Sequence, residues 1–329
     1  MADQLNQRAG PTLPLQKDTV LDKLFADPNR NYAKVILGLE GWEFFALHNQ
    51  LLASIDSPRD PTATHERMCK HDSYHRLYNC LEWLHSANSC RAREYTLGWA
   101  KSSCNEDIPH VLKAVISHLG NQIEWPDVAT RALWANEHTG VFRGNIGIGD
   151  IKESEIDKPK DPELERATWS GKMLCNTLKT FCIIARNGRV IFKLTGIPGG
   201  RNDRDVWTSC TLYLQSGVFF SPGEWVAFDG GFRGDGPNIC SYNDIAGDVD
   251  RELFNSTFTE VRKYIENLYG RVGMWFPILG NSQKRWIHSH KLFSFTVMAT
   301  YCMHNWLMHI RGLNYNPATN PNSLFTRYY

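Results

Sequence analysis

Three acidic residues in the second half of the chain stand where a carboxylate could do chemistry. Asp150 ends the apolar run GNIGIGD at residues 144–150. Asp229 ends a second apolar run, EWVAFD, and is followed by two glycines, while Glu266 lies within a stretch of helical periodicity. A lone Asp-Gly-Gly also fits an acid that caps a turn, so Asp229 taken by itself has a structural interpretation too.

Three carboxylates gathered at one place repel one another, and divalent cations make such a cluster tolerable. Mg²⁺ or Mn²⁺ suits oxygen ligands and leaves coordination positions open for phosphate and water. Two such ions about 4 Å apart can activate a water or a 3′-hydroxyl and stabilise the leaving oxyanion in an in-line phosphoryl transfer. The small residues Gly230 and Gly231 would let a bulky substrate backbone approach Asp229.

The elements that must position these acids alternate between strand and helix. We expect a strand at 144–150, a solvated loop at 152–165 and a hairpin at 181–196, whose Asn187-Gly188 pair favours a type I′ turn. The further elements expected are a helix at 203–214, a strand at 225–229, and helices at 255–276 and 291–311. This order predicts a mixed α/β domain with a central sheet flanked by helices.

The first part of the chain carries helical patterns and no clear strand. Apolar periodicity predicts helices at 31–55 and 72–87 and two more at 93–100 and 108–119, with a polar turn at 102–105. The last two resemble a helix-turn-helix, although a plain packing role fits the pattern equally well. If this region reads DNA, the expected contacts are Lys101, Asn105, His110 and Lys113.

The bulk composition excludes little. The formal net charge is +1, yet residues 281–329 contain no acidic residue, a mild basic bias that suits a polyanion. Nine cysteines without CxxC pairs indicate buried thiols in a reducing compartment and no disulfide framework. Residues 292–310 carry no formal charge, but Ser294, His304, Asn305 and His309 favour a buried helix over a membrane span.

Residues from about 141 to 309 resemble the nuclease domain of the PIF/Harbinger transposases and their domesticated relatives, a DDE superfamily endonuclease family. Each block of this stretch is similar to a family motif, and the blocks stand in the family's order. They are GNIGIGD, SGKMLCNTLKTFCIIARNGRVIFKLTGIPGGRNDRDVW, AFDGGF, FNSTFTEVRKYIENLYGRV and CMHNW. In the fourth block the matching residues are Asn255, Arg262, Glu266 and Gly270.

The resemblance implies an RNase-H-like fold in which Asp150, Asp229 and Glu266 are both the catalytic and the metal-binding residues. It also implies Mg²⁺ or Mn²⁺ as cofactor, two ions in number, and double-stranded DNA at transposon terminal repeats and a short target site as substrate. By the same analogy we expect a Myb-like DNA-binding partner protein, a homo-oligomer, and a nuclear location, or a cytoplasmic one without the partner.

The predicted division of the chain has an all-α region before the RNase-H-like domain. Its parts are an extension with one helical segment at 1–65, a helical region at 66–138, the nuclease domain at 139–312 and an irregular tail at 313–329.

This chain departs from the family pattern at three places. The family follows its first Asp with Gly-Thr-His, and this chain reads Ile151, Lys152, Glu153. A Lys that follows the helix Glu in the family corresponds to Gly273, and the second motif ends in Phe232 in place of Tyr. These changes affect contacts near the metals or mark a divergent lineage.

Other residues have two interpretations each. Asp203 either contributes to the site or caps the helix that begins there. Arg262 either pairs with Glu266 four residues on or faces a phosphate. Trp286, beside Lys284 and Arg285, could stack on an unpaired base, and most other tryptophans fit the core.

The leading hypothesis is a metal-dependent DNA transposase or endonuclease that cuts phosphodiesters and transfers strands. The alternative is a domesticated, catalytically inactive DNA-binding or chromatin adaptor that retains the fold. A third interpretation, a metal hydrolase for a small substrate, would require a narrow, deep pocket at the acids.

Overall fold

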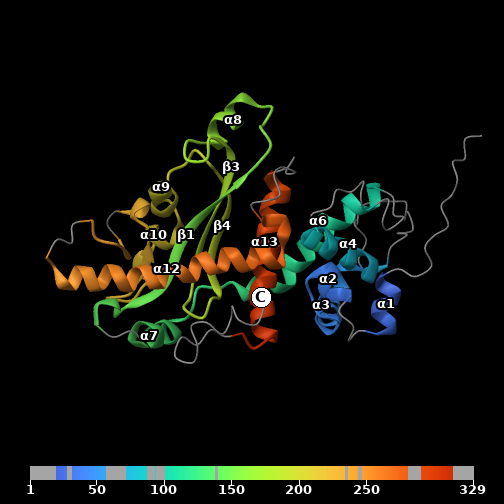
Figure 1. Cartoon of the computed structure of the whole chain (residues 1–329), viewed down its shortest axis with the longest axis horizontal. Coiled ribbons are helices and arrows are strands. Elements are labelled where there is room, and N and C mark those ends of the chain that lie inside the picture. Colours follow the sequence, from blue (N-terminus) through green and yellow to red (C-terminus); the bar gives the residue numbers. More distant parts are fainter. Residues whose placement is uncertain are drawn as a thin grey trace, which may run out of the picture. The chain divides into compact units, whose positions relative to one another are not determined.

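The computed structural model describes residues 20–27, 32–56, 72–86, 93, 101–137, 140–233, 236–243, 247–280 and 290–313 (Figure 1). The chain divides into two compact units, and the boundary between them falls between Val111 and Leu112, inside helix α6. The predicted contacts Lys284, Arg285 and Trp286, and most of the helix predicted at 93–100, lie outside the described residues.

The described residues of the first unit form helices only. These are α1 (Val20–Ala26), α2 (Tyr32–Leu37), α3 (Gly41–Ile55), α4 (Ser73–Ser86) and α6 (Lys101–Leu119), which continues into the second unit. Helix α4 confirms the helix predicted at 72–87. The single helix predicted at 31–55 is instead two helices, because Gly38 takes a left-handed conformation (φ 70°) that ends α2.

The polar turn predicted at 102–105 is wrong, since these residues lie in the first turns of α6. Serine and asparagine are favoured at helix starts as well as in turns, so the pattern did not distinguish the two. Lys101, Asn105 and Lys113 are exposed on α6, and His110 is half-buried there.

The second unit is built around a six-stranded mixed sheet. Its strands are β1 (Asn145–Glu155), β2 (Trp169–Ser170), β3 (Cys175–Ile184), β4 (Val190–Pro198), β5 (Trp225–Phe228) and β6 (Asn238–Cys240). Strand β3 pairs antiparallel with β1, β4 and the short β2, whereas β5 and β6 run parallel to β1. The order β2-β3-β1-β5-β6 therefore places β1 at the centre, between an antiparallel half and a parallel half.

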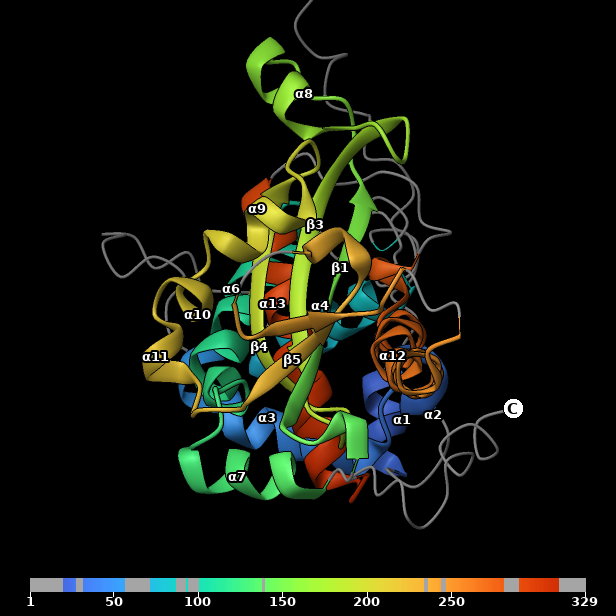
Figure 2. The same ribbon diagram turned by 90° about the vertical axis from the view of Figure 1, so that its left-hand side faces the viewer.

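Helices cover both faces of this sheet (Figures 1 and 2). On one face lie α12 (Val249–Trp275) and α13 (His290–Ile310). On the other lie α9 (Asp203–Thr208), α10 (Thr211–Leu214) and α11 (Ser216–Phe219). The remaining elements are α7 (Val128–Glu137), α8 (Pro162–Thr168) and the short helices η1 (Gly120–Gln122), η2 (Gly140–Phe142), η3 (Gly230–Phe232) and η4 (Pro277–Leu279).

Elements in this unit confirm much of the predicted order and correct parts of it. Helices α12 and α13 confirm the two long C-terminal helices, and β5 confirms the strand that precedes Asp229. The helix predicted at 203–214 breaks at Ser209 and Cys210 into α9 and α10. The predicted loop at 152–165 is confirmed only for residues 156–161, because β1 continues to Glu155 and α8 begins at Pro162.

The hairpin β3–β4 is confirmed, but its type I′ turn is wrong. A type I′ turn needs positive φ at both central residues, and here Gly188 (φ 79°) has it while Asn187 does not. The amide of Gly188 donates to the carbonyl oxygen of Ala185, and the amide of Ala185 donates to the carbonyl oxygen of Arg189. The turn is thus closed by a left-handed glycine next to a register shift, the arrangement of a glycine bulge.

The parallel pairing of β1 with β5 depends on one glycine. Gly149 is opposite Phe228 in the register, and a Cβ atom at residue 149 would overlap the Phe228 ring. That ring also stacks on Phe232 at 4.7 Å and contacts Trp207 at the same centroid distance, within the buried core under α9. Glycine at 149 therefore lets β5 and its aromatic core close on β1.

Helix α13 is largely buried in this unit, as the pattern of residues 292–310 predicted. Among the described residues, none of the helices combines the length and the apolar character that crossing a membrane requires.

Replacing Gly149 by Ala should destabilise the protein by about 1–3 kcal/mol, because the added methyl group overpacks the Phe228 contact. The measurement is urea unfolding followed by tryptophan fluorescence. The matched control is Gly217→Ala, where a Cβ atom meets no other atom within 4 Å. Equal stability of the Gly149 variant and the control would contradict this account of the β1–β5 pairing.

Candidate functional site

The structure brings Asp150, which lies on β1, close to Asp229, which directly follows the neighbouring parallel strand β5. Gly149 pairs with Phe228, and the residues that follow this last pair are the two aspartates. Adjacent strands in a sheet are about 4.8 Å apart, which makes these residues direct neighbours. Asp150 is not at the end of its strand as predicted, because β1 continues for five residues beyond it.

Asp150 is the more buried of the pair, and burial changes its acidity. Desolvation raises the pKa of the Asp150 carboxyl to about 6, against the lowering effects of the Ile151 amide and the Arg262 charge. The negative charges of Asp229 and Asp203 raise that pKa further. The amide of Ile151 donates to Asp150 Oδ1 at 2.8 Å, and the Tyr269 hydroxyl donates to the Asp150 carbonyl oxygen at 2.9 Å.

Glu266 lies on α12 and is linked to the two aspartates by an arginine that pairs with it and with Asp229. Arg262 lies between the acids, with Nη1 3.6 Å from Asp229 Oδ2 and Nη2 3.6 Å from Glu266 Oε1. The Glu266 side chain is 59% exposed. The predicted i,i+4 pair between Arg262 and Glu266 is present, and the same guanidinium also neutralises Asp229.

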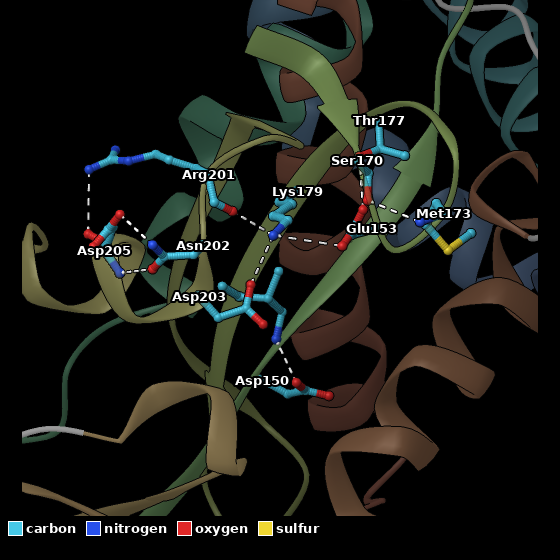
Figure 3. A network of polar contacts seen from close by, with 11 residues as sticks. Asp150, Glu153, Ser170, Met173, Thr177, Lys179, Arg201, Asn202, Asp203 and Asp205 are labelled. Atoms are coloured by element: carbon cyan, nitrogen blue, oxygen red, sulfur yellow. Dashed lines mark hydrogen bonds and ion pairs between the residues drawn. The ribbon is translucent and has the colours of Figure 1, made fainter. Parts of the chain in front are cut away.

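Asp203 stands at the start of α9, and it does not cap that helix. The N-cap is Asn202, whose side-chain oxygen accepts the amide of Asp205 at 2.7 Å. Asp203 Oδ1 instead accepts a hydrogen bond from the Lys179 ammonium at 2.9 Å. Figure 3 shows Asp203 beside Lys179, to which it is bonded.

The two glycines after Asp229 leave space beside it. A Cβ atom at Gly230 would meet nothing within 4 Å, and one at Gly231 would meet only Asp203, at 3.6 Å from Oδ2. Neither glycine has a positive φ that would demand glycine. The backbone conformation therefore does not require glycine at these two positions, and the effect of their small size is to leave open space next to the acids.

The three residues that follow Asp150 all have structural partners. Ile151 packs against the core under α9. The Lys152 ammonium lies over the Tyr269 ring at 5.6 Å, and burial lowers its pKa. Glu153 accepts a hydrogen bond from the Thr177 hydroxyl at 2.9 Å and pairs with Lys179 at 3.6 Å. The departures at 151–153 are thus built into the scaffold around the site.

At Gly273 packing does not demand glycine, because a Cβ atom there would meet only Gly280, at 3.9 Å.

Two asparagines, Asn255 and Asn305, hold backbone segments in place. Asn255 accepts the amide of Tyr242 and donates to its carbonyl oxygen, which ties α12 to the segment after β6. Asn305 makes the same pair of bonds to Val190 and donates to the carbonyl of Gln122, which ties α13 to β4. The prediction that His304 and Asn305 are buried hydrogen-bonding groups is confirmed.

Residues 150–305 match a family model whose description is DDE superfamily endonuclease. The match covers 156 of 329 residues, just under half of the chain, and includes Asp229 and Glu266. It supports placing this part of the chain in that superfamily. The curated proteins hold no match to the chain, and neither do the solved structures.

DDE endonucleases use divalent metals, and the donor atoms here suit such an ion. Asp150 and Asp229 follow the Gly149–Phe228 pair on neighbouring strands, so both carboxylates are available in the same region of the sheet. Among the described residues, however, no three His, Cys, Asp or Glu side chains are gathered closely enough to hold an ion. A three-acid site with Glu266 therefore requires the Arg262 guanidinium to leave its place between the acids.

The raised pKa of Asp150 predicts a pH-dependent gain from removing its charge. The folded carboxyl has a pKa of about 6 against about 3.9 in an unfolded chain, so ionisation lowers stability as the pH rises through 6. Asp150→Asn should then stabilise the protein by about 1–3 kcal/mol at pH 7.5, and the difference should vanish below about pH 4. Denaturant unfolding at both pH values measures this.

The control is Glu155→Gln, an exposed acid on the same strand, which should shift stability by less than about 0.5 kcal/mol at either pH. An Asp150→Asn variant that is less stable than wild type at pH 7.5 would contradict the assigned cause of the pKa shift.

Proposed function

We propose that this chain is a divalent-metal-dependent DNA endonuclease of the DDE type, acting as a transposase or a nuclease derived from one. The observation that carries the proposal is the β1–β5 register, which makes Asp150 and Asp229 neighbours inside the stretch that matches the superfamily. The finer assignment to the PIF/Harbinger group remains a prediction from the ordered motifs.

The roles of the residues follow from their places in the fold. Asp150 and Asp229 would hold one ion between them, and Glu266 would complete the site from α12 once Arg262 is displaced. Mg²⁺ or Mn²⁺, which we expect as two ions, would supply the activation of a water or 3′-hydroxyl and the stabilisation of the leaving oxyanion. The displaced Arg262 guanidinium is then free to pair with a phosphate of the substrate backbone.

The sheet order supports an RNase-H-like domain. A central strand that carries the first acid, an antiparallel half and a parallel half that carries the second acid are consistent with that architecture. The open space at Gly230 beside Asp229 suits a bulky polymer backbone.

The expected partners remain part of the proposal. We expect double-stranded DNA as substrate, at terminal repeats and a short target site, a Myb-like partner protein, self-association and a nuclear location. The further DNA contacts that we propose are Lys101, Asn105, His110, Lys113, Lys284, Arg285 and Trp286. The division of the chain at 65, 138 and 312 likewise remains a prediction.

Purified protein, supplied with a Myb-like partner, should cut or join transposon-end DNA in Mg²⁺ and not in EDTA. Asp150→Asn, Asp229→Asn and Glu266→Gln should each lower the rate by roughly 100-fold or more, since each removes a carboxylate that serves the ions. The control is Glu260→Gln, which removes an exposed acid of the same helix that pairs only locally with Lys263. If wild type leaves the DNA intact in Mg²⁺, or if the Asp150→Asn variant keeps full activity, the proposed nuclease activity is refuted.

A second candidate is a domesticated, non-catalytic DNA-binding or chromatin adaptor. It is favoured by the position of Arg262, whose charge neutralises Asp229 and Glu266 without any metal, and by the built-in departures at 151–153. Under this function wild type and Glu266→Gln should bind DNA with equal affinity in EDTA and in Mg²⁺, and neither should cleave it. DNA cleavage by wild type in Mg²⁺ that the Glu266→Gln variant has lost would exclude the adaptor.

A further inference from the structure

The positive charge of the chain is concentrated in two segments, residues 166–202 and 267–329. Together they contain thirteen Lys and Arg and no Asp or Glu, whereas the other 229 residues contain 23 Lys and Arg against 35 Asp and Glu. In the fold the first segment supplies the hairpin β3–β4, and the second supplies the end of α12 and the whole of α13. Because Asn305 ties α13 to β4, the two basic segments meet in the second unit.

Four half-buried arginines stand where the hairpin turn meets the ends of the two helices. They are Arg186 and Arg189 in the turn, Arg271 on α12 and Arg311 directly after α13. Arg271 reaches the turn, because a Cβ atom at Gly188 would lie 3.6 Å from its Nη1. The guanidinium carbons of Arg271 and Arg311 lie 5.9 and 4.9 Å from the centroid of one ring, that of Trp275.

Neutral groups hold two of these guanidiniums in place. Arg271 Nη1 lies 2.9 Å from the Met308 sulfur, and Arg189 Nη2 lies 3.5 Å from two oxygens of Gln122. Among the described residues, Arg186 and Arg189 form no ion pair, and the buried Nε of Arg186 has no hydrogen-bond partner. The two turn arginines therefore have N–H donors available for an anion.

The buried ring of His304 indicates that the positive charges act at one place. Its centroid lies 5.4 Å from that of Trp275. Burial, together with the positive charges of Arg271 and Arg189, lowers the pKa of His304 to about 3, against the raising effect of its hydrogen bond with Asn305. The imidazole is thus neutral near pH 7, and the charge of the cluster comes from the arginines.

We propose that Arg186, Arg189, Arg271 and Arg311 form a phosphate-binding surface for the DNA backbone, which is separate from the acids and does not require a metal ion. This inference rests on the proposed function for the choice of DNA as the polyanion. Guanidinium groups suit that partner, because each presents a planar fork of N–H donors to phosphate oxygens. Contacts of this kind position a duplex without reading its sequence.

The strand register gives the separation between this surface and the acids. Asp150 pairs with Cys182 and Ile148 with Ile184, so the turn begins about four residues, or roughly 13 Å, along the strand from Asp150. A duplex covers that length in about four base pairs, at about 3.4 Å each. Contact at the turn would hold DNA on the protein while Arg262 still lies between Asp229 and Glu266.

The test is binding of a labelled duplex of about 30 base pairs in EDTA, followed by fluorescence anisotropy over a range of KCl concentrations. The double variant Arg189→Gln/Arg271→Gln should bind about tenfold or more weakly than wild type. The slope of log affinity against log salt should fall in magnitude by about 2, because two phosphate contacts are lost. Unchanged affinity and slope would overturn the proposed surface.

The matched control is Arg251→Gln/Lys263→Gln, which removes the same charge from α12 at two cations that already pair with acids. Its salt slope should equal that of wild type, and a loss as large as that of the Arg189/Arg271 variant would overturn the surface in favour of bulk charge. Arg189→Lys/Arg271→Lys keeps both charges and should keep most of the slope, which a purely structural role of the arginines would not produce.

A measurement on wild type decides if the glutamine variant does not fold. Bound DNA should protect Arg186 and Arg189 from modification by phenylglyoxal, as read by mass spectrometry, and leave Arg251 reactive. Equal modification with and without DNA would overturn the surface. Polyglutamate that protects these arginines better than DNA would identify an acidic protein segment as the partner and would overturn the assignment to DNA.

The outcomes separate this inference from the function it rests on. Mg²⁺-dependent cleavage by a protein whose Arg189/Arg271 variant binds DNA as wild type does would overturn the surface and leave the proposed nuclease intact. Binding of DNA through these arginines by a wild type that never cleaves it in Mg²⁺ would overturn the nuclease and leave the surface intact.

Discussion

The register between two parallel strands is the constraint on which the site depends. Because Gly149 has no side chain, the Phe228 ring can lie against β1, and this contact fixes which residues of β1 and β5 are neighbours. The residues that follow this last pair are Asp150 on β1 and Asp229 directly after β5, so the register brings the two acids close together. A slip of one residue would turn one of the two acids to the other face of the sheet, so the site exists only in this pairing.

Concentrated negative charge has to be balanced, and the structure does so from both faces of the sheet. Arg262 on α12 pairs with Asp229 and Glu266 on one side, and Lys179 on β3 pairs with Glu153 and Asp203 on the other. Even so, the pKa of Asp150 stays raised because burial outweighs the favourable charges. Such a site lowers the stability of the fold in exchange for reactive groups, the usual relation between a functional centre and its scaffold.

Local patterns in the sequence predicted the elements and not the contacts between them. The apolar runs before Asp150 and Asp229 and the periodicity of α12 and α13 depend on residues close in the chain, and those predictions are confirmed. The continuation of β1 through charged residues was missed because Lys152 is accommodated by Tyr269, which is distant in sequence. The pairing of Lys179 with Glu153 likewise depends on strand register, and Asn202 competes with Asp203 for the same cap.

The central claim is that Asp150 and Asp229 hold a divalent cation between them. Anomalous diffraction from crystals grown with saturating Mn²⁺ tests it most directly. The account predicts an anomalous peak bonded to both carboxylates, with the Arg262 guanidinium moved from its place between Asp229 and Glu266. Absence of a peak at this pair, with Arg262 still between the two acids, would contradict the account.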